Sequence, residues 1–139
     1  IMIQKELADR LVAKPGTKQY GIPTVLCAQY TTISTIVQAS RGAFYPPPRV
    51  DSTVIQLDFS RGNAFNIDEH ILAQVVRAAF GARRKTIKRS LALTFSAEKV
   101  KIALEAAGID PVVRAEALPL ASFVDLARAM GTLCEFNTP

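Results

Sequence analysis

The stretch ISTIVQASRGAFYPPPRVDSTVIQLDF, residues 33–59, places two strand-like segments on either side of a stiff connection. Its first eight residues are rich in β-branched side chains, and apolar residues recur from Val54 to Phe59, so both segments are predicted to be β-strands. Both carry apolar side chains on both faces. A hairpin of this kind is not stable alone, so we expect it to join a larger sheet.

The connection between the two strands is aromatic and rich in proline. Phe44 and Tyr45 run directly into Pro46, Pro47 and Pro48, which fix the backbone and remove hydrogen-bond donors. One interpretation is a tight connector with Phe44 in the core. The other is an aromatic ring held in place to stack on a flipped or single-stranded base. The residues alone leave both interpretations open.

The predicted secondary structure of the chain changes after about Ser60. Before it, IMI predicts the end of a buried strand and QKELADRLVAK a short amphipathic helix, which makes this part α/β. After it, the pattern is all-helical, with predicted helices that begin at Asp68 and Ser96 and end at Gly81 and Gly108. Further helices are predicted around residues 87–91 and over 119–131. We therefore expect two parts, residues 1–62 and 63–139, and we expect the chain to be a fragment because no structural start signal precedes Ile1.

The composition is that of a globular protein with a basic surface. Of 139 residues, 49% are hydrophobic and 21% charged, which excludes a disordered chain. A net charge of +5 favours polyanionic partners. Cys27 and Cys134 lie far apart and are predicted to be free thiols. No apolar run reaches the ~20 residues of a membrane span, and no signal peptide is present, so a cytoplasmic location without membrane contact is predicted.

The charge is concentrated in one run, FGARRKTIKRSL, residues 80–91. It contains five cations within seven residues and no acid: Arg83, Arg84, Lys85, Lys88 and Arg89. On a helix, Arg84 and Lys88, and likewise Lys85 and Arg89, would be like charges four residues apart, which destabilise the free helix until a polyanion neutralises them. The run therefore favours contact with nucleic-acid phosphates. The alternative is a solvated face whose cations pair with distant carboxylates.

A complete catalytic or metal-binding set is absent from the sequence. His70 is the only histidine and lies within a helical pattern, so it is predicted to be a surface residue rather than a metal ligand. Neither a G-x-G-x-x-G nor a phosphate-binding GK[ST] loop occurs. No cofactor site can therefore be predicted from the residues.

Four stretches together resemble one family. They are MIQKELADRLVAKPGTKQYG (residues 2–21), GAFYPPPRVDSTVIQL (42–57), FGARRKTIKRSL (80–91) and GIDPVVRAEALPLASFVDLARAM (108–130). In this order they are similar to the bacterial small-subunit ribosomal RNA adenine dimethyltransferases, the KsgA-like enzymes. The similarity covers nearly the whole chain. It implies the C-terminal portion of such an enzyme.

The resemblance implies a fold, an activity and site residues. The fold would be the C-terminal edge of a Rossmann-like methyltransferase sheet, with an antiparallel hairpin near Thr32–Ala39 and Ser52–Phe59, followed by a small helical rRNA-docking domain. The activity would be S-adenosylmethionine-dependent dimethylation of N6 on two adjacent adenines near the 3′ end of small-subunit rRNA. Phe44 matches the phenylalanine that stacks on the target adenine, and Tyr45 and Pro46–Pro48 belong to the target-pocket loop. Val50 matches the valine of the same motif.

The sequence departs from the family pattern in one large respect. The glycine-rich cofactor loop, the acidic ribose-binding residue and the Asn-Leu-Pro-Tyr catalytic motif are all missing. We therefore expect this chain alone neither to bind S-adenosylmethionine nor to methylate RNA. An exposed hairpin edge is also expected to allow self-association.

Two other functions stay open. The first is a non-catalytic RNA- or ribosome-binding module, which is what the chain would be if nothing else accompanied it. The second is a helix-turn-helix DNA-binding module built from residues 66–91, which would prefer duplex DNA and would leave the Phe44 stretch unexplained.

Overall fold

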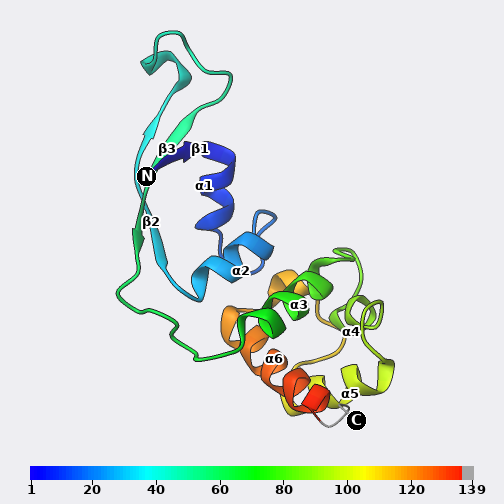
Figure 1. Ribbon diagram of the computed structural model, residues 1–139. Coiled ribbons are helices and arrows are strands. Elements are labelled where there is room, and N and C mark those ends of the chain that lie inside the picture. The colour runs from blue at the N-terminus through cyan, green and yellow to red at the C-terminus, as the bar shows by residue number, and fades with distance from the viewer. Residues whose placement is uncertain (136–139) are drawn as a thin grey trace. The chain divides into compact units, whose positions relative to one another are not determined.

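The computed structural model describes residues 1–135, and it divides into two compact units (Figure 1). The first unit comprises Ile1–Lys14 and Gln19–Ala64. The second comprises Pro15–Lys18 and the chain from Phe65 onward. The sequence suggested a boundary after Gly62 and gave no sign that Pro15–Lys18 belongs with the helical part.

The first unit is a small antiparallel sheet with two short helices. Its elements in chain order are β1 (Met2–Gln4), α1 (Lys5–Leu11), α2 (Ile22–Ala28), β2 (Thr32–Ala39), the 3-10 turn η1 (Arg41–Ala43) and β3 (Ser52–Asp58). The strand order is β1-β3-β2, and both pairs are antiparallel. The predicted hairpin is therefore confirmed as β2 and β3. It does join a further strand, because β1 pairs with the free edge of β3.

One extra residue interrupts the hairpin ladder. Thr35 lies opposite Ile55 and Val37 lies opposite Val54, so Ile36 has no partner across the strands. This arrangement is a β-bulge, which bends an edge strand and increases its twist. Ile36 and Val37 remain 60% and 52% exposed. Within the described residues, β2 is thus an edge strand with apolar side chains in solvent.

The first strand differs from its prediction in burial. The sequence predicted a buried strand at residues 1–3, but Ile1 and Met2 are 66% and 54% exposed. The reason is that β1 pairs only with β3 and forms the other edge of this small sheet. An apolar run by itself cannot distinguish a central strand from an edge strand.

The two helices of the first unit are joined by a buried hydroxyl. Thr24 Oγ1 accepts a hydrogen bond from the Gly21 N–H at 3.1 Å and donates one to the Arg10 carbonyl at 2.6 Å. The first bond satisfies a free N–H at the start of α2, and the second links α2 to the end of α1.

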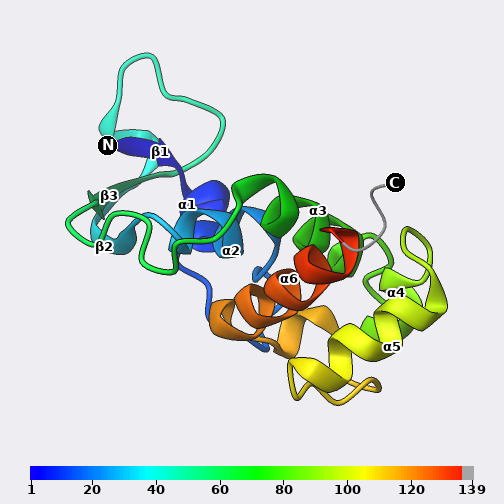
Figure 2. The same cartoon turned by 60° about the horizontal axis from the view of Figure 1, so that its bottom comes forward.

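The second unit is a cluster of helices. Its elements are α3 (Glu69–Phe80), α4 (Ile87–Leu91), α5 (Ala97–Ala106), the 3-10 turn η2 (Ala115–Ala117) and α6 (Leu120–Glu135). α3 and α5 both pack on α6 (Figure 2). The rings of Phe80 and Phe123 stack at a centroid distance of 5.7 Å, and Leu72 and Leu126 are fully buried. The described part of the chain contains no helix long and apolar enough to span a bilayer.

Helix starts in the second unit follow the sequence closely. Asp68 accepts hydrogen bonds from the N–H groups of His70 and Ile71, and Ser96 accepts one from Lys99 N–H. Both predicted N-caps are confirmed. The predicted helix around residues 87–91 is also confirmed as α4, whose N-cap is Thr86.

Candidate functional site

The first candidate surface is the loop that joins β2 to β3. Its base is closed by Asp51, whose carboxylate accepts a hydrogen bond from the Arg41 N–H at 2.9 Å. The Asp51 carbonyl accepts another from the Lys5 N–H, also at 2.9 Å. These two bonds anchor the loop to η1 on one side and to α1 on the other. In Figure 1 the loop extends beyond the strands of the sheet.

The aromatic residues of this loop differ in exposure. Phe44 follows η1 in an extended conformation and is half-buried. Tyr45 is fully exposed, and Pro46, Pro47 and Pro48 are exposed as well. The loop thus carries a run of exposed, donor-poor side chains next to one half-buried ring. Such a surface suits contact with the face of a planar ligand. The role of Phe44 in stacking stays a prediction.

The second candidate surface is the basic run, which the structure folds differently from the helix considered above. Residues 81–85 form turns, and the Lys85 N–H donates to the Ala82 carbonyl at 2.8 Å. The helix begins only after Thr86, so Arg84 and Lys85 lie before it, while Lys88 and Arg89 lie within it. The interpretation of Arg84/Lys88 and Lys85/Arg89 as helical pairs is therefore wrong. The cause is local, since the Thr86 side chain accepts from the Arg89 N–H and starts the helix there.

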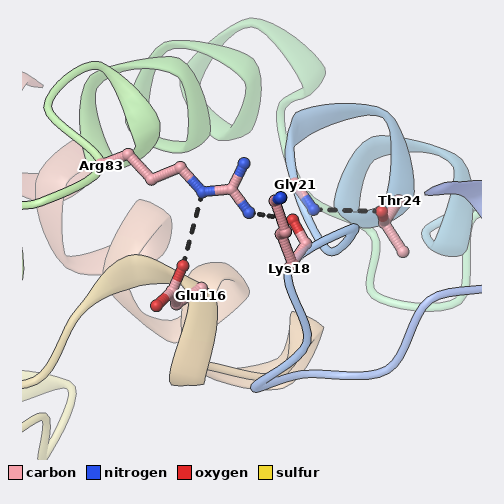
Figure 3. Close-up of polar contacts among 5 residues, drawn as sticks. All are labelled: Lys18, Gly21, Thr24, Arg83 and Glu116. Carbon is pink, nitrogen blue, oxygen red and sulfur yellow. Dashed lines mark hydrogen bonds and ion pairs between the residues drawn. The ribbon is translucent and has the colours of Figure 1, made fainter.

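Arg83 is engaged with the protein itself (Figure 3). Its Nε lies 3.4 Å from a carboxylate oxygen of Glu116, and its guanidinium also donates to the Lys18 carbonyl. Gly16, near Lys18, donates its N–H to the Glu116 carbonyl at 2.6 Å. Arg83 and Glu116 together therefore attach Pro15–Lys18 to the second unit.

The other four cations of the run are exposed and lack such partners. Arg84, Lys85, Lys88 and Arg89 make no side-chain hydrogen bond or ion pair with any described residue. A solvated face paired with distant carboxylates, the alternative interpretation, accounts for Arg83 but not for these four. These four unpaired cations lie within six residues. Phosphate groups could bind them without first breaking an ion pair inside the protein.

The titratable side chains outside these two surfaces form no metal-ligand cluster in the part of the chain that the structure describes. His70 is exposed, as predicted, and no cluster of potential metal ligands occurs among the described residues. Burial raises the pKa of the half-buried Cys27 thiol, which is free and disfavoured as a thiolate nucleophile. Burial also raises the pKa of Tyr20 to about 12. The side chain of Cys134 lies outside the described part of the chain, so its predicted free thiol stays a prediction.

Sequence reasoning missed a third surface, a groove between α3 and the chain that follows α4. Gln74 and Arg77 line it from one side, and Leu93, Thr94 and Phe95 line it from the other. The two sides are about 20 residues apart in the sequence, so no motif joins them. The one available signal was Leu93, an apolar residue just beyond a basic helix that proves to be 66% exposed.

The sequence matches a known protein family over nearly its whole length. The family model described as ribosomal RNA adenine dimethylase matches residues 1–131 of the chain. The chain belongs to this family. The resemblance inferred from four sequence stretches is thereby confirmed.

Members of the family align with almost all of this chain. A ribosomal RNA small subunit methyltransferase A from Geobacillus thermodenitrificans is 42% identical over 136 residues, which cover 94% of the chain and 46% of that protein. The enzyme of the same name from Bifidobacterium longum is 39% identical, with 94% and 45% covered. The chain therefore spans about half the length of these family members.

Solved structures support the fold. A dimethyladenosine transferase from Plasmodium falciparum superposes with a TM-score of 0.77 at 24% identity, covering 98% of this chain and 55% of that one. The 23S rRNA methyltransferase ErmE superposes with a TM-score of 0.63 at 19% identity, covering 94% and 53%. The sheet and helices of the chain therefore correspond to part of a methyltransferase fold.

Proposed function

We propose that this chain forms the RNA-contacting part of a longer small-subunit rRNA adenine dimethyltransferase. That enzyme would transfer methyl groups from S-adenosylmethionine to N6 of two adjacent adenines near the 3′ end of the rRNA. In this proposal the three-stranded sheet of the first unit is the antiparallel edge of a Rossmann-like sheet, and the second unit docks on the assembling small ribosomal subunit. Family membership supports the class of enzyme.

The observation that carries the proposal is the set of four cations without partners. Arg84, Lys85, Lys88 and Arg89 are exposed on one short segment. Like charges held this close repel one another, and phosphates of RNA would replace that repulsion with charge-assisted contacts. Arg83 has a different role in this proposal, because its ion pair with Glu116 orders the segment that carries the other four.

The loop of the first unit supplies the second part of the proposal. Phe44 stacks on the target adenine, while the exposed Tyr45 and Pro46–Pro48 shape the mouth of the target pocket. Stacking on an anchored aromatic ring holds a base outside its helix, which chemistry at an exocyclic amine requires.

A non-catalytic RNA-binding module is the second candidate function. It rests on the same four exposed cations, since contact with RNA phosphates needs no catalytic group. A helix-turn-helix reader of duplex DNA is disfavoured, because α4 has only five residues and is roughly 8 Å long, which is short for a helix that reads a major groove.

Charge reversal tests the docking role of the basic run. The double variant Arg84→Glu, Lys88→Glu is expected to bind a small-subunit rRNA fragment more weakly and with a flatter dependence on salt. Each lost phosphate contact lowers the slope of log K against log salt by about 0.7 to 0.9. Fluorescence anisotropy at several salt concentrations measures that slope.

A matched double variant serves as the control. Arg61→Glu, Arg114→Glu changes the net charge by the same amount at two exposed cations outside the run. The proposal requires its salt slope to stay close to that of the unmodified chain. Equal slopes for the two double variants would show that only the total charge matters and would contradict docking through the basic run.

A further inference from the structure

The groove of the second unit is large enough for a small planar ligand. It has a volume of about 500 Å³, within the roughly 300–1,000 Å³ typical of ligand sites. We call it the α3–α4 groove and define it by Gln74 and Arg77 on α3 and by Leu93 and Phe95 after α4. All four residues belong to the second unit.

The walls of the α3–α4 groove are held together by a buried hydroxyl. Ser90 is 1% exposed, and its Oγ donates to the Ala78 carbonyl at 2.8 Å and accepts from the Ala82 N–H at 3.2 Å. These bonds join the end of α3 to α4. The Phe95 N–H donates to the Leu91 carbonyl at 2.9 Å, which fixes the far wall to α4 as well. The groove therefore exists before any ligand binds.

The two walls differ in chemistry. Leu93 is 66% exposed and Phe95 is half-buried, so this wall offers an aliphatic and an aromatic side chain to a ligand. Gln74 and Arg77 lie three residues apart on α3 and therefore face the same side. Both are exposed, and neither side chain bonds to another described residue. One wall is thus apolar, and the other carries an amide and a guanidinium that make no hydrogen bond within the described part of the chain.

The chain segment that forms the groove is basic and contains no acid, which favours an anionic ligand. No aspartate or glutamate occurs between His70 and Ala97, while six cations do: Arg77, Arg83, Arg84, Lys85, Lys88 and Arg89. A ligand that combines a flat apolar face, hydrogen-bonding edges and a negative charge would satisfy every feature of the groove. A nucleotide has all three.

We propose that the α3–α4 groove binds one unpaired nucleotide of RNA, with its base against Leu93 and Phe95, its edge at Gln74 and its phosphate at Arg77. The inference rests on the proposed function, in which the second unit contacts RNA. It adds a base-binding site to what the basic run supplies, since phosphate contacts alone do not distinguish paired from unpaired RNA. A base within a duplex cannot reach the groove without leaving its stack.

The experiment compares two RNA probes on the full 139-residue chain. One is a 12-nucleotide single strand of mixed sequence, and the other is the same strand in a duplex. Fluorescence anisotropy at one fixed salt concentration gives both affinities. Leu93→Ser is expected to weaken single-strand binding by about tenfold, as for loss of one apolar side chain buried against a base, and to change duplex binding less than twofold. Phe95→Leu, which keeps apolar packing but removes the ring, is expected to act in the same direction.

Val112→Ser is the matched control. Val112 is 68% exposed, close to the 66% of Leu93, and lies in the same unit but outside the groove. It is expected to leave both affinities unchanged. Arg77→Gln is expected to weaken single-strand binding more than duplex binding, because the proposed phosphate contact at Arg77 belongs to the unpaired nucleotide in the groove.

The outcomes separate this inference from the proposed function. If the unmodified chain binds RNA but both groove variants retain their single-strand affinity within twofold, the groove inference is wrong while docking through the basic run stands. The inference also fails if the groove variants weaken both probes equally. If neither probe binds the unmodified chain, the proposed RNA contact itself is wrong, and the groove inference with it.

Discussion

At the scale of single residues, Phe44 is where the proposed chemistry can be tested most directly. In the longer enzyme proposed above, Phe44→Ala should cost about 1–3 kcal/mol of transition-state binding, the usual value of a base–aromatic stack, and should lower kcat/KM for rRNA methylation accordingly. Phe44→Tyr keeps the ring and should retain most of the activity. Methyl transfer to a small-subunit particle measures both.

A control for this prediction comes from Phe59 at the other end of the hairpin, which is 60% exposed. Phe59→Ala removes an equally large ring outside the loop and should leave the methylation rate unchanged. If Phe44→Ala is as active as Phe59→Ala, Phe44 serves the loop as a structural residue. That result would support the connector interpretation that the sequence left open.

The cations show what single-residue reasoning could and could not predict. The five basic residues look equivalent in the sequence, but Arg83 pairs with Glu116, which lies 33 residues further along the chain. No local pattern indicates a partner at that distance. The exposure of Arg84 and Lys88 could be predicted from residue type alone, because arginine and lysine are rarely buried without a partner.

At the scale of elements, the end of α5 carries a testable backbone requirement. Gly108 has a φ of +66°, its N–H donates to the Glu105 carbonyl, and the Ile109 N–H donates to the Leu104 carbonyl. This Schellman arrangement needs a left-handed residue, which costs a side-chain-bearing residue about 1–2 kcal/mol. Gly108→Ala should therefore lower the free energy of unfolding by about 1 kcal/mol in urea titrations followed by circular dichroism.

Gly42 provides the comparison for that measurement. It does not have a positive φ, and an added Cβ would meet nothing closer than 3.9 Å. Gly42→Ala should leave the free energy of unfolding unchanged or slightly raised. Equal values for the two variants would contradict the claim that Gly108 is required for its conformation.

The elements themselves were predictable wherever a local rule decides them. Asp68, Ser96 and Gly108 mark helix ends through bonds to residues only a few positions away, so the sequence indicates them. The helical pairing of Arg84 with Lys88 failed because Thr86 starts α4 inside a basic run that has no other break. The place of Pro15–Lys18 was not predictable, since it depends on the bond between Gly16 and Glu116 across 100 residues.

At the scale of the whole molecule, the sheet has only three strands and ends at β2. Ile36 and Val37 are exposed on that edge strand, and the bulge at Ile36 interrupts the regular ladder. A bulged edge pairs less readily with another copy than a flat one. Self-association through this edge stays a prediction. The bulge in β2 is a reason to expect it to be weak.

The distribution of glycine along the whole chain bears on the methyl donor. The seven glycines are scattered, and the spacing G-x-G-x-x-G of a cofactor loop does not occur among them. We therefore expect isothermal titration of S-adenosylmethionine into the 139-residue chain to give no saturable heat. A full-length ribosomal RNA small subunit methyltransferase A, titrated in the same buffer, should bind it. Micromolar binding to the chain would mean that its own residues form a binding site for S-adenosylmethionine. The proposal that this chain supplies only the RNA-contacting part of the longer enzyme would then be wrong.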